Sequence, residues 1–222
     1  NTRITKNHDV EKRYIHALLK EWKMYRQVFG KAPVIRELHL GGGTPTFFSA
    51  ENLQYLVERL LAGAIVPKDH EFALEGHPNN TTGEHLQVLH DLGFNRVSYG
   101  VQDLDLKVQM AINRIQPFAN VKYVTEAAKG IGYTSVNFDL IYGLPFQTLD
   151  SITHTISQVC QLMPDRIAFY SYAHVPWTSR GQRLFDENDL PSPDLKMQLY
   201  QRGSQLLNDL SYHNIGMDHF AL

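Results

Sequence analysis

The chain has 222 residues, of which 43% are hydrophobic and 20% are charged, and its formal net charge is -2. This ordinary globular composition excludes a disordered protein, and no window of about 18 uncharged apolar residues is present to cross a membrane. The near-neutral charge gives no general attraction to nucleic acid or acidic lipid, and the single cysteine, Cys160, excludes an internal disulfide and indicates a reducing, cytoplasmic setting.

Helix-period and strand-like segments alternate along the whole chain. Apolar residues spaced by three and four predict helices, and short apolar runs ended by glycine or proline predict strands. We predict six strands, over 37–40, 71–75, 96–101, 135–142, 166–172 and 213–217. A helix over 9–29 precedes the first strand, and the helices between the strands are one capped by Ser49, one opened by a capping box at 81–84 and closed by Gly93, one over 121–131, one over 152–163, and one begun by Ser192-Pro193.

This alternation indicates the fold class. Strands separated by single amphipathic helices are typical of parallel βαβ units. Six such units fit a barrel, a partial barrel or a doubly wound sheet. No G-x-G-x-x-G run follows the first strand, which disfavours a dinucleotide-binding sheet. The pattern therefore favours an α/β barrel or partial barrel with parallel strands inside and helices outside.

Polar residues and glycines stand at the carboxyl end of every predicted strand. The segments are Gly41–Thr44, Glu75–His77, Gln102–Asp103, Asp139–Gly143, Tyr172–His174 and Asp218–His219. Active sites of parallel barrels lie at the carboxyl ends of the strands, so we expect these segments to meet at one rim. A capped turn explains any one of them, whereas six together favour a binding site.

Two of these segments point to binding of a small molecule. Gly41-Gly42-Gly43, fixed at its exit by Pro45, can expose main-chain groups to a ligand, although a tight turn is the alternative. Asp139 lies among apolar strand residues and therefore needs a partner or a ligand. Arg114 could be that partner, in which case the pair would be purely structural.

Eleven histidines raise the alternative of a metal site, although no H-E-x-x-H motif is present. A site built from His77, His174 and His219 would suit a metal-dependent hydrolase. A lone histidine at a rim is more often a hydrogen-bonding or proton-handling group. Cys160 lies on the apolar face of a predicted helix, so we expect it to be an inert core residue.

Several motifs taken together resemble one family. Gly41–Thr46, Gly93–Ser98, Gly100–Asp103 and Asn137–Pro145 resemble the radical S-adenosylmethionine (SAM) enzymes of porphyrin synthesis, namely the oxygen-independent coproporphyrinogen III oxidases. A related haem-chaperone branch shares the glycine and Asp-Leu-Ile-Tyr-Gly-Leu-Pro motifs. The segments that resemble the oxidase rather than the chaperone are Asn113–Gln116, Tyr172–Trp177 and Gly216–Ala221.

The resemblance, which covers essentially the whole chain, implies a partial (β/α) barrel of the radical SAM type that lacks the first strand and the cluster loop. Residues 1–222 would form a single domain of a longer protein. The family holds a 4Fe-4S cluster through a C-x3-C-x2-C loop, which we expect immediately before Asn1, so that this chain supplies no metal ligand.

The implied activity is that of an oxidoreductase of haem biosynthesis. A 5′-deoxyadenosyl radical from SAM would remove a hydrogen atom from each of two propionate side chains of coproporphyrinogen III. Loss of carbon dioxide and one electron from each would leave vinyl groups and give protoporphyrinogen IX. The resemblance also implies an electron donor such as flavodoxin or ferredoxin, and we expect a cytoplasmic monomer that binds neither nucleic acid nor membrane. The alternative is a haem-binding chaperone of the same superfamily.

The resemblance assigns SAM-binding roles to eight residues and leaves the catalytic residue unknown. The main chain of Gly42 would meet the methionine part of SAM, and Glu75 would contact the same SAM. A second SAM site would be lined by Gly43, Thr44, Gln102, Arg114, Asp139 and Ala173. Because the substrate is tetra-anionic, loop cations are expected to face it, namely Arg3, Arg114, Arg180 and Arg183, whereas Arg36, Arg96 and Arg166 precede strands and are expected to be structural.

Overall fold

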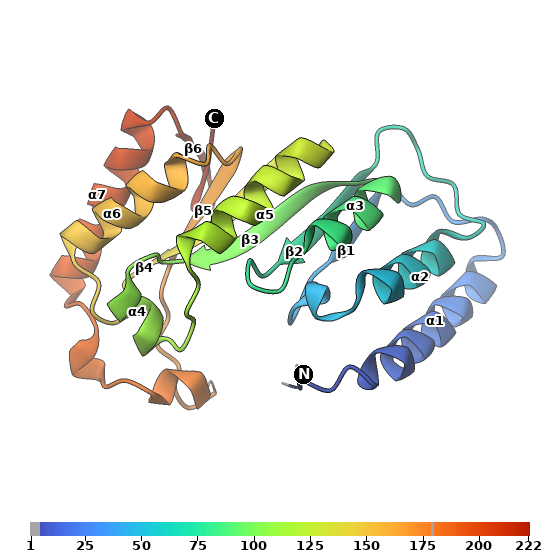
Figure 1. Ribbon diagram of the computed structural model, residues 1–222, viewed down its shortest axis with the longest axis horizontal. Helices are drawn as coiled ribbons and strands as arrows, with labels where there is room; N and C mark the ends of the chain where they lie inside the picture. Colours follow the sequence, from blue (N-terminus) through green and yellow to red (C-terminus); the bar gives the residue numbers. More distant parts are fainter. Residues whose placement is uncertain (1–4, 179) are drawn as a thin grey trace. The chain divides into compact units, whose positions relative to one another are not determined.

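The computed structural model describes residues 5–178 and 180–222 (Figure 1). Contacts divide the described chain into two compact units. The first contains the described residues up to Ser98 together with Ala127–Thr134, and the second contains Tyr99–Glu126 and Ser135–Leu222. The single-domain expectation for 1–222 stays a prediction.

The first unit begins with a long helix and alternates strands with helices. Its elements are α1 (Val10–Phe29), β1 (Glu37–Leu40), a 3-10 turn (Pro45–Phe47), α2 (Ala50–Leu61), β2 (Glu71–Gly76), α3 (Gly83–Asp91), the first part of β3 (Phe94–Gln102) and the end of α5 (Phe118–Ile131). The hydrogen-bond order of the strands is β1-β2-β3, and β1 is parallel to β2 with Leu40 opposite Leu74. This register brings the residues after β1 level with the end of β2.

A buried carboxylate ties α1 to α2 within this unit. Glu11 is 1% exposed. Its Oε2 accepts hydrogen bonds from the Ser49 main-chain N–H (3.0 Å) and the Asn52 side chain (2.7 Å), and its Oε1 lies 2.5 Å from His8 Nδ1. Three partners satisfy the buried charge, as burial of a carboxylate requires. The segment that follows the glycine loop is thereby anchored at the start of α2.

The second unit contains the rest of β3 and α5 together with α4 (Leu106–Ala111), β4 (Ser135–Tyr142), α6 (Leu149–Cys160), β5 (Arg166–Ser171), 3-10 turns at Arg180–Arg183 and Glu187–Asp189, α7 (Pro193–Asp209), β6 (His213–Gly216) and β7 (His219–Ala221). Its strand order is β3-β4-β5-β7-β6. β4 and β5 are parallel, with Asp139 opposite Ala168, and β7 is antiparallel to β5, with His219 opposite Ala168.

Alternation along β4 separates a core face from a polar face. Val136, Phe138 and Leu140 are fully buried, and they alternate with the half-buried residues 135, 137, 139 and 141. The buried residues Ile152 and Ile156 come from α6, and α7 packs against α6 (Figure 1). Because successive side chains of a strand point to opposite faces, Asp139 lies on the face opposite this core.

The sixth strand predicted over 213–217 is present as β6 (His213–Gly216) and runs in the same direction as β5, but the short strand β7 between them was not predicted. β6 ends at Gly216, Met217 and Asp218 form a tight turn with φ of 50° and 60°, and the chain returns as β7, antiparallel to both β6 and β5. A two-residue hairpin turn with positive φ at both positions normally carries asparagine or glycine. Met-Asp gives no such signal, so the sequence pattern does not reveal the reversal.

Other boundaries also differ from the predictions. The capping box is formed by Thr82 and His85 rather than by residues 81 and 84, because the Thr81 hydroxyl bonds instead to the His77 carbonyl (3.0 Å). The six-residue helix α4 is too short to show a period and was not predicted. The helix predicted over 152–163 ends at Cys160. Among the described residues, no helix is both long enough and apolar enough to cross a bilayer.

Candidate functional site

The glycine loop after β1 is fastened to the end of β2. The Gly42 main-chain N–H donates to Glu75 Oε2 (3.1 Å), and Glu75 Oε1 lies 3.0 Å from His39 Nε2. A Cβ on Gly41 would lie 2.4 Å from His39 Nε2 and 2.8 Å from Glu75 Oε1, so a larger residue there would displace these two side chains. Glu75 therefore fixes the conformation of a loop whose main chain is exposed.

This loop suits a small molecule that carries a positive charge and hydrogen-bonding groups. Gly42 and Gly43 have φ of 70° and 72°, which glycine adopts without strain. A Cβ on Gly42 would meet nothing within 4 Å. The Glu75 side chain is 47% exposed and can accept hydrogen bonds from a ligand as well as from Gly42. Thr44 follows and begins the 3-10 turn, accepting from the Phe47 N–H at 2.9 Å.

The second unit contains a separate polar cluster at the end of β3. Arg114 Nη2 donates to the Gly100 carbonyl (2.6 Å). A Cβ on Gly100 would lie 2.8 Å from Gln102 Nε2 and 3.0 Å from Arg114 Nη2, so both side chains lie across this glycine. Burial lowers the pKa of Arg114, and the negative charge of Asp139 opposes that shift. Asp139 and Arg114 are therefore electrostatic neighbours, as the sequence predicts.

Two atoms of this cluster are buried without a hydrogen-bond partner among the described residues. They are Arg114 Nε and Gln102 Oε1. Buried polar atoms are nearly always hydrogen-bonded, so each exception needs an explanation. Gln102 is also in the left-handed region with φ of 66°. Unsatisfied polar atoms together with local strain are typical of a binding site that a ligand completes.

The remaining predicted residue, Ala173, lies in the exposed loop after β5. Its carbonyl accepts from Gln182 Nε2 (3.1 Å), and Gln182 Oε1 accepts from the Val175 N–H (2.5 Å). Gln182 therefore shapes this loop. The structure brings Gly42 together with Glu75 in the first unit, and Gln102 together with Arg114 and Asp139 in the second.

Sequence reasoning missed Tyr170 and its pairing with His219, which it had considered only as a rim residue or metal ligand. Tyr170 on β5 and His219 on β7 form a pair, with Tyr170 Oη 3.4 Å from His219 Nε2. Burial raises the pKa of Tyr170, and the nearby charges of Asp139 and Asp218 raise it further. The sequence did offer one signal for this cluster. Gly100 is a glycine in the interior of a strand, which indicates close approach of another group.

The contacts of the arginines separate those with structural roles from those in loops. Arg36 pairs with Asp69 (2.7 Å) and Arg96 pairs with Glu71, which supports their structural roles. Arg183 Nε donates to the Pro176 carbonyl (2.8 Å), which orders the loop after β5. Two of the cations expected to face the substrate, Arg3 and the side chain of Arg180, lie outside the described residues.

The described residues contain no group of three histidine, cysteine, aspartate or glutamate side chains that could hold a metal ion. The hypothesis of a site built from His77, His174 and His219 therefore gains no support. Cys160 is buried, and burial raises the pKa of its thiol to about 12. Because a metal ligand must be the thiolate, Cys160 is unsuited to bind iron.

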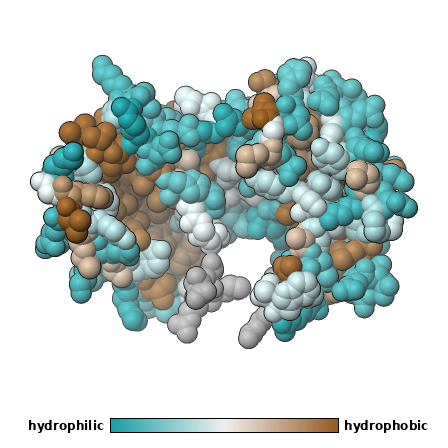
Figure 2. All heavy atoms as spheres, turned by 180° about the vertical axis from the view of Figure 1, so that it is seen from behind, coloured by the Kyte–Doolittle hydropathy of each residue, from teal (hydrophilic) through white to brown (hydrophobic). Residues whose placement is uncertain are grey.

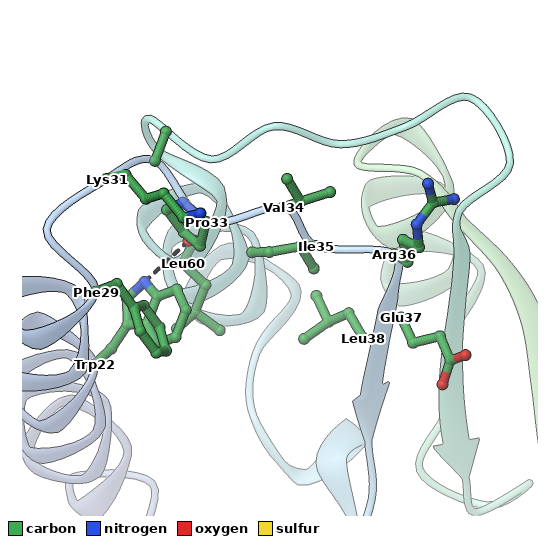
Figure 3. A pocket seen from close by; sticks show the side chains of 11 residues that line it. Trp22, Phe29, Lys31, Pro33, Val34, Ile35, Arg36, Glu37, Leu38 and Leu60 are labelled. Carbon is green, nitrogen blue, oxygen red and sulfur yellow. Dashed lines mark hydrogen bonds between the residues drawn. The ribbon is translucent and has the colours of Figure 1, made fainter.

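The first unit also contains a mainly apolar hollow. It has a volume of about 810 Å³ and is lined mainly by apolar side chains of α1, α2 and the segment leading into β1 (Figure 3). Trp22 Nε1 at its wall donates to the Leu60 carbonyl at 3.1 Å. Figure 2 shows hydrophobic side chains gathered on this face of the first unit. With few polar groups, the hollow is a poorer site for a charged ligand than the glycine loop.

Comparison with known proteins shows the family of the chain. The family described as the radical SAM superfamily matches residues 7–159. A Helicobacter pylori protein named oxygen-independent coproporphyrinogen III oxidase is 44% identical over 212 residues, which cover 94% of this chain and 46% of that protein. A Pseudomonas aeruginosa protein of the same name is 40% identical over 100% of this chain and 49% of its own length. The chain thus spans about half the length of the curated relatives it matches.

Among solved structures, coproporphyrinogen III oxidase from Escherichia coli, described as a radical SAM enzyme, matches with a TM-score of 0.94 and 36% identity. The match covers 99% of this chain and 50% of that one. An archaeal Elp3 from Methanocaldococcus infernus matches with a TM-score of 0.63 at 16% identity, which speaks for the fold alone. These likenesses confirm the predicted α/β fold class, a mostly parallel partial barrel.

Proposed function

The chain belongs to the radical SAM superfamily, and on that premise we propose that the protein oxidatively decarboxylates two propionate side chains of coproporphyrinogen III. The products are vinyl groups, carbon dioxide and protoporphyrinogen IX, an intermediate of haem synthesis. The shared name of the relatives supports this substrate, and the motifs at 113–116 and 216–221 support the oxidase over the related chaperone.

The observation that carries the proposal is the fastening of the exposed glycine loop by Glu75. SAM bears an amino group, a carboxylate, a sulfonium and ribose hydroxyls, so it needs main-chain groups and at least one anionic acceptor. Gly42 and its neighbours offer the main chain, and Glu75 offers the carboxylate. When bound, SAM supplies a carbon-centred radical that can remove hydrogen from an unactivated carbon.

The polar cluster of the second unit, formed by Gln102, Arg114 and Asp139, suits another SAM molecule. The Arg114 guanidinium can bind a ligand carboxylate through its paired donors, and the unsatisfied Nε is one of these donors. The Asp139 carboxylate and the side-chain Oε1 of Gln102 can accept hydrogen bonds from amino or hydroxyl groups of the ligand. Ala173, in the exposed loop after β5 of the same unit, would add a further contact. In this arrangement the chain binds and orients its ligands.

The superfamily also implies a 4Fe-4S cluster, and the described residues do not fit it. They supply no set of three ligands, and the buried Cys160 thiol resists deprotonation. Cluster ligands therefore have to come from outside the described residues. A small redox protein such as flavodoxin or ferredoxin would supply the electron.

Replacing Glu75 by glutamine is expected to raise the dissociation constant for SAM about tenfold, because a hydrogen bond to a charged group is lost and the loop is freed. Binding of radiolabelled SAM to the intact gene product by equilibrium dialysis measures this. Glu71→Gln is the matched control, since Glu71 begins the same strand and pairs with Arg96. Equal effects of the two substitutions would contradict the assignment.

Haem titration of the same protein separates the oxidase from the alternative. A haem chaperone would bind haem tightly with defined stoichiometry and would leave coproporphyrinogen III unchanged. The oxidase is expected to convert the porphyrinogen and to show no such haem binding.

A further inference from the structure

A buried polar hub, centred on Asp103 and Gln147, adjoins Gln102 in the second unit. We propose that Asp103 and Gln147 are positioning residues, which hold Gln102, Arg114 and Asp139 in the arrangement that binds SAM. The inference rests on the proposed function of this cluster. It assigns the SAM affinity of the cluster to two side chains that do not touch the ligand.

Asp103 is the centre of the hub. It is fully buried and directly follows Gln102. Its Oδ1 accepts from the Thr155 hydroxyl (2.9 Å) and the Asp105 N–H (2.7 Å), and its Oδ2 accepts from Gln147 Nε2 (2.6 Å). Three donors from separate segments therefore fix this carboxylate in one orientation.

Gln147 uses both ends of its amide. Its Oε1 accepts from the N–H groups of Gly143 (2.7 Å) and Leu144 (3.0 Å), and its Nε2 donates to the Ile141 carbonyl (2.8 Å) as well as to Asp103. One buried side chain thereby closes the turn after β4 and joins it to the segment after β3. Ile141 lies two residues beyond Asp139 on the same strand.

The hub also reaches the connection that carries Arg114. Gln109 Nε2 donates to the main-chain carbonyls of Asp103 and Gln116, both at 2.9 Å. The Arg114 N–H donates to the Gln109 carbonyl at 2.8 Å. Each of the three elements that the hub joins therefore carries one ligand-binding side chain of the cluster.

The conformation of Gln102 shows why such anchoring is needed. A residue with a Cβ is strained at a φ of 66°, and it stays there only where its surroundings over-determine it. The next residue, Asp103, is held by three side-chain hydrogen bonds and donates its own N–H to the Val101 carbonyl at 2.9 Å. Loosening this anchor would let Gln102 relax away from Gly100 and Arg114.

A reciprocal exchange tests the pair. In Asp103→Asn an amide replaces the carboxylate. The new NH2 group then faces a side chain or main-chain group that donated to the carboxylate, so two donors oppose each other. In Gln147→Glu two carboxylates face each other. The double variant Asp103→Asn/Gln147→Glu restores one donor and one acceptor with their places exchanged, although the bond to the Ile141 carbonyl is lost. Each single variant is expected to raise the dissociation constant for SAM about tenfold, and the double variant to recover to within about threefold of wild type.

Amide hydrogen exchange of residues 102–105 and 143–144 gives a readout that does not depend on SAM. Protection is expected to fall in both single variants and to return in the double variant. Single variants that lose thermal stability while their SAM affinity and local protection stay unchanged would overturn the positioning role. If the wild-type protein binds no SAM, the proposed function fails, while the exchange data still decide whether the pair fixes this conformation.

Thr155→Val covers the case in which the exchange variants do not fold. It removes only the hydroxyl that donates to Asp103 and accepts from the Leu104 N–H (3.1 Å). We expect a several-fold rise in the SAM dissociation constant, with Thr155→Ser as the control that retains the hydroxyl. Equal affinities of the valine and serine variants would contradict the proposal.

Discussion

Replacing Arg114 by alanine is expected to lower kcat/KM about 100- to 1,000-fold in the intact protein, which corresponds to about 3–4 kcal/mol of lost binding. The half-buried guanidinium lies across Gly100 and beside Asp139, so the substitution removes the donors for a ligand carboxylate. It also leaves Asp139 without the neighbouring positive charge. Anaerobic turnover of coproporphyrinogen III, followed by vinyl formation, measures the effect.

Asp139→Ala is expected to act in the same direction, because it leaves a half-buried guanidinium without its counter-charge. Arg114→Lys should give an intermediate loss, since lysine keeps the charge but not the paired donors. Arg36→Ala is the control, because Arg36 forms an exposed ion pair with Asp69 and should change turnover by less than about twofold. If either alanine variant loses stability but turns over normally when folded, the pair is a structural ion pair only.

Gly100→Ala is expected to lower kcat/KM about 100-fold. The added Cβ would lie 2.8 Å from Gln102 Nε2 and 3.0 Å from Arg114 Nη2, so both binding side chains must move. A displacement of about 1 Å in a binding group can cost a factor of this size. The φ of Gly100 is outside the left-handed region, so the backbone accepts alanine without strain.

Gly130→Ala is the matched control for this substitution. Gly130 lies within α5, its φ is also outside the left-handed region, and a Cβ there would meet nothing within 4 Å. Alanine should leave turnover unchanged and raise the free energy of unfolding by up to about 1 kcal/mol, as expected inside a helix. Equal turnover of the two alanine variants would contradict the arrangement of Arg114 and Gln102 across Gly100.

The repeating elements could be predicted from the sequence because each depends on local pattern. The apolar period of α1 ends at Gly30, and Ser49 caps α2, as predicted. The reversal at Met217–Asp218 could not be predicted, because those residues adopt a strained turn that only the surrounding packing selects. Local pattern thus gives the repeating elements but not the short returning strand β7.

The candidate site divides in the same way. Gly42 follows β1 and Glu75 lies near the end of the parallel strand β2, so their proximity could be predicted from the order of the elements. The link between Asp103 and Gln147 spans 44 residues of sequence. A buried glutamine gives no sequence signal that identifies its partner, because its amide can bond to main chain or side chain alike. The hub therefore emerges only from the three-dimensional structure.

The transfer of hydrogen from the propionate to SAM tests the central claim most directly. Coproporphyrinogen III deuterated at the propionate carbon next to the ring would be incubated anaerobically with the intact, iron-loaded gene product, SAM and a reductant. We predict that deuterium appears in 5′-deoxyadenosine and that each vinyl group formed is accompanied by one carbon dioxide. A loaded protein that forms unlabelled 5′-deoxyadenosine, or that leaves the porphyrinogen intact while it binds haem, would contradict the account.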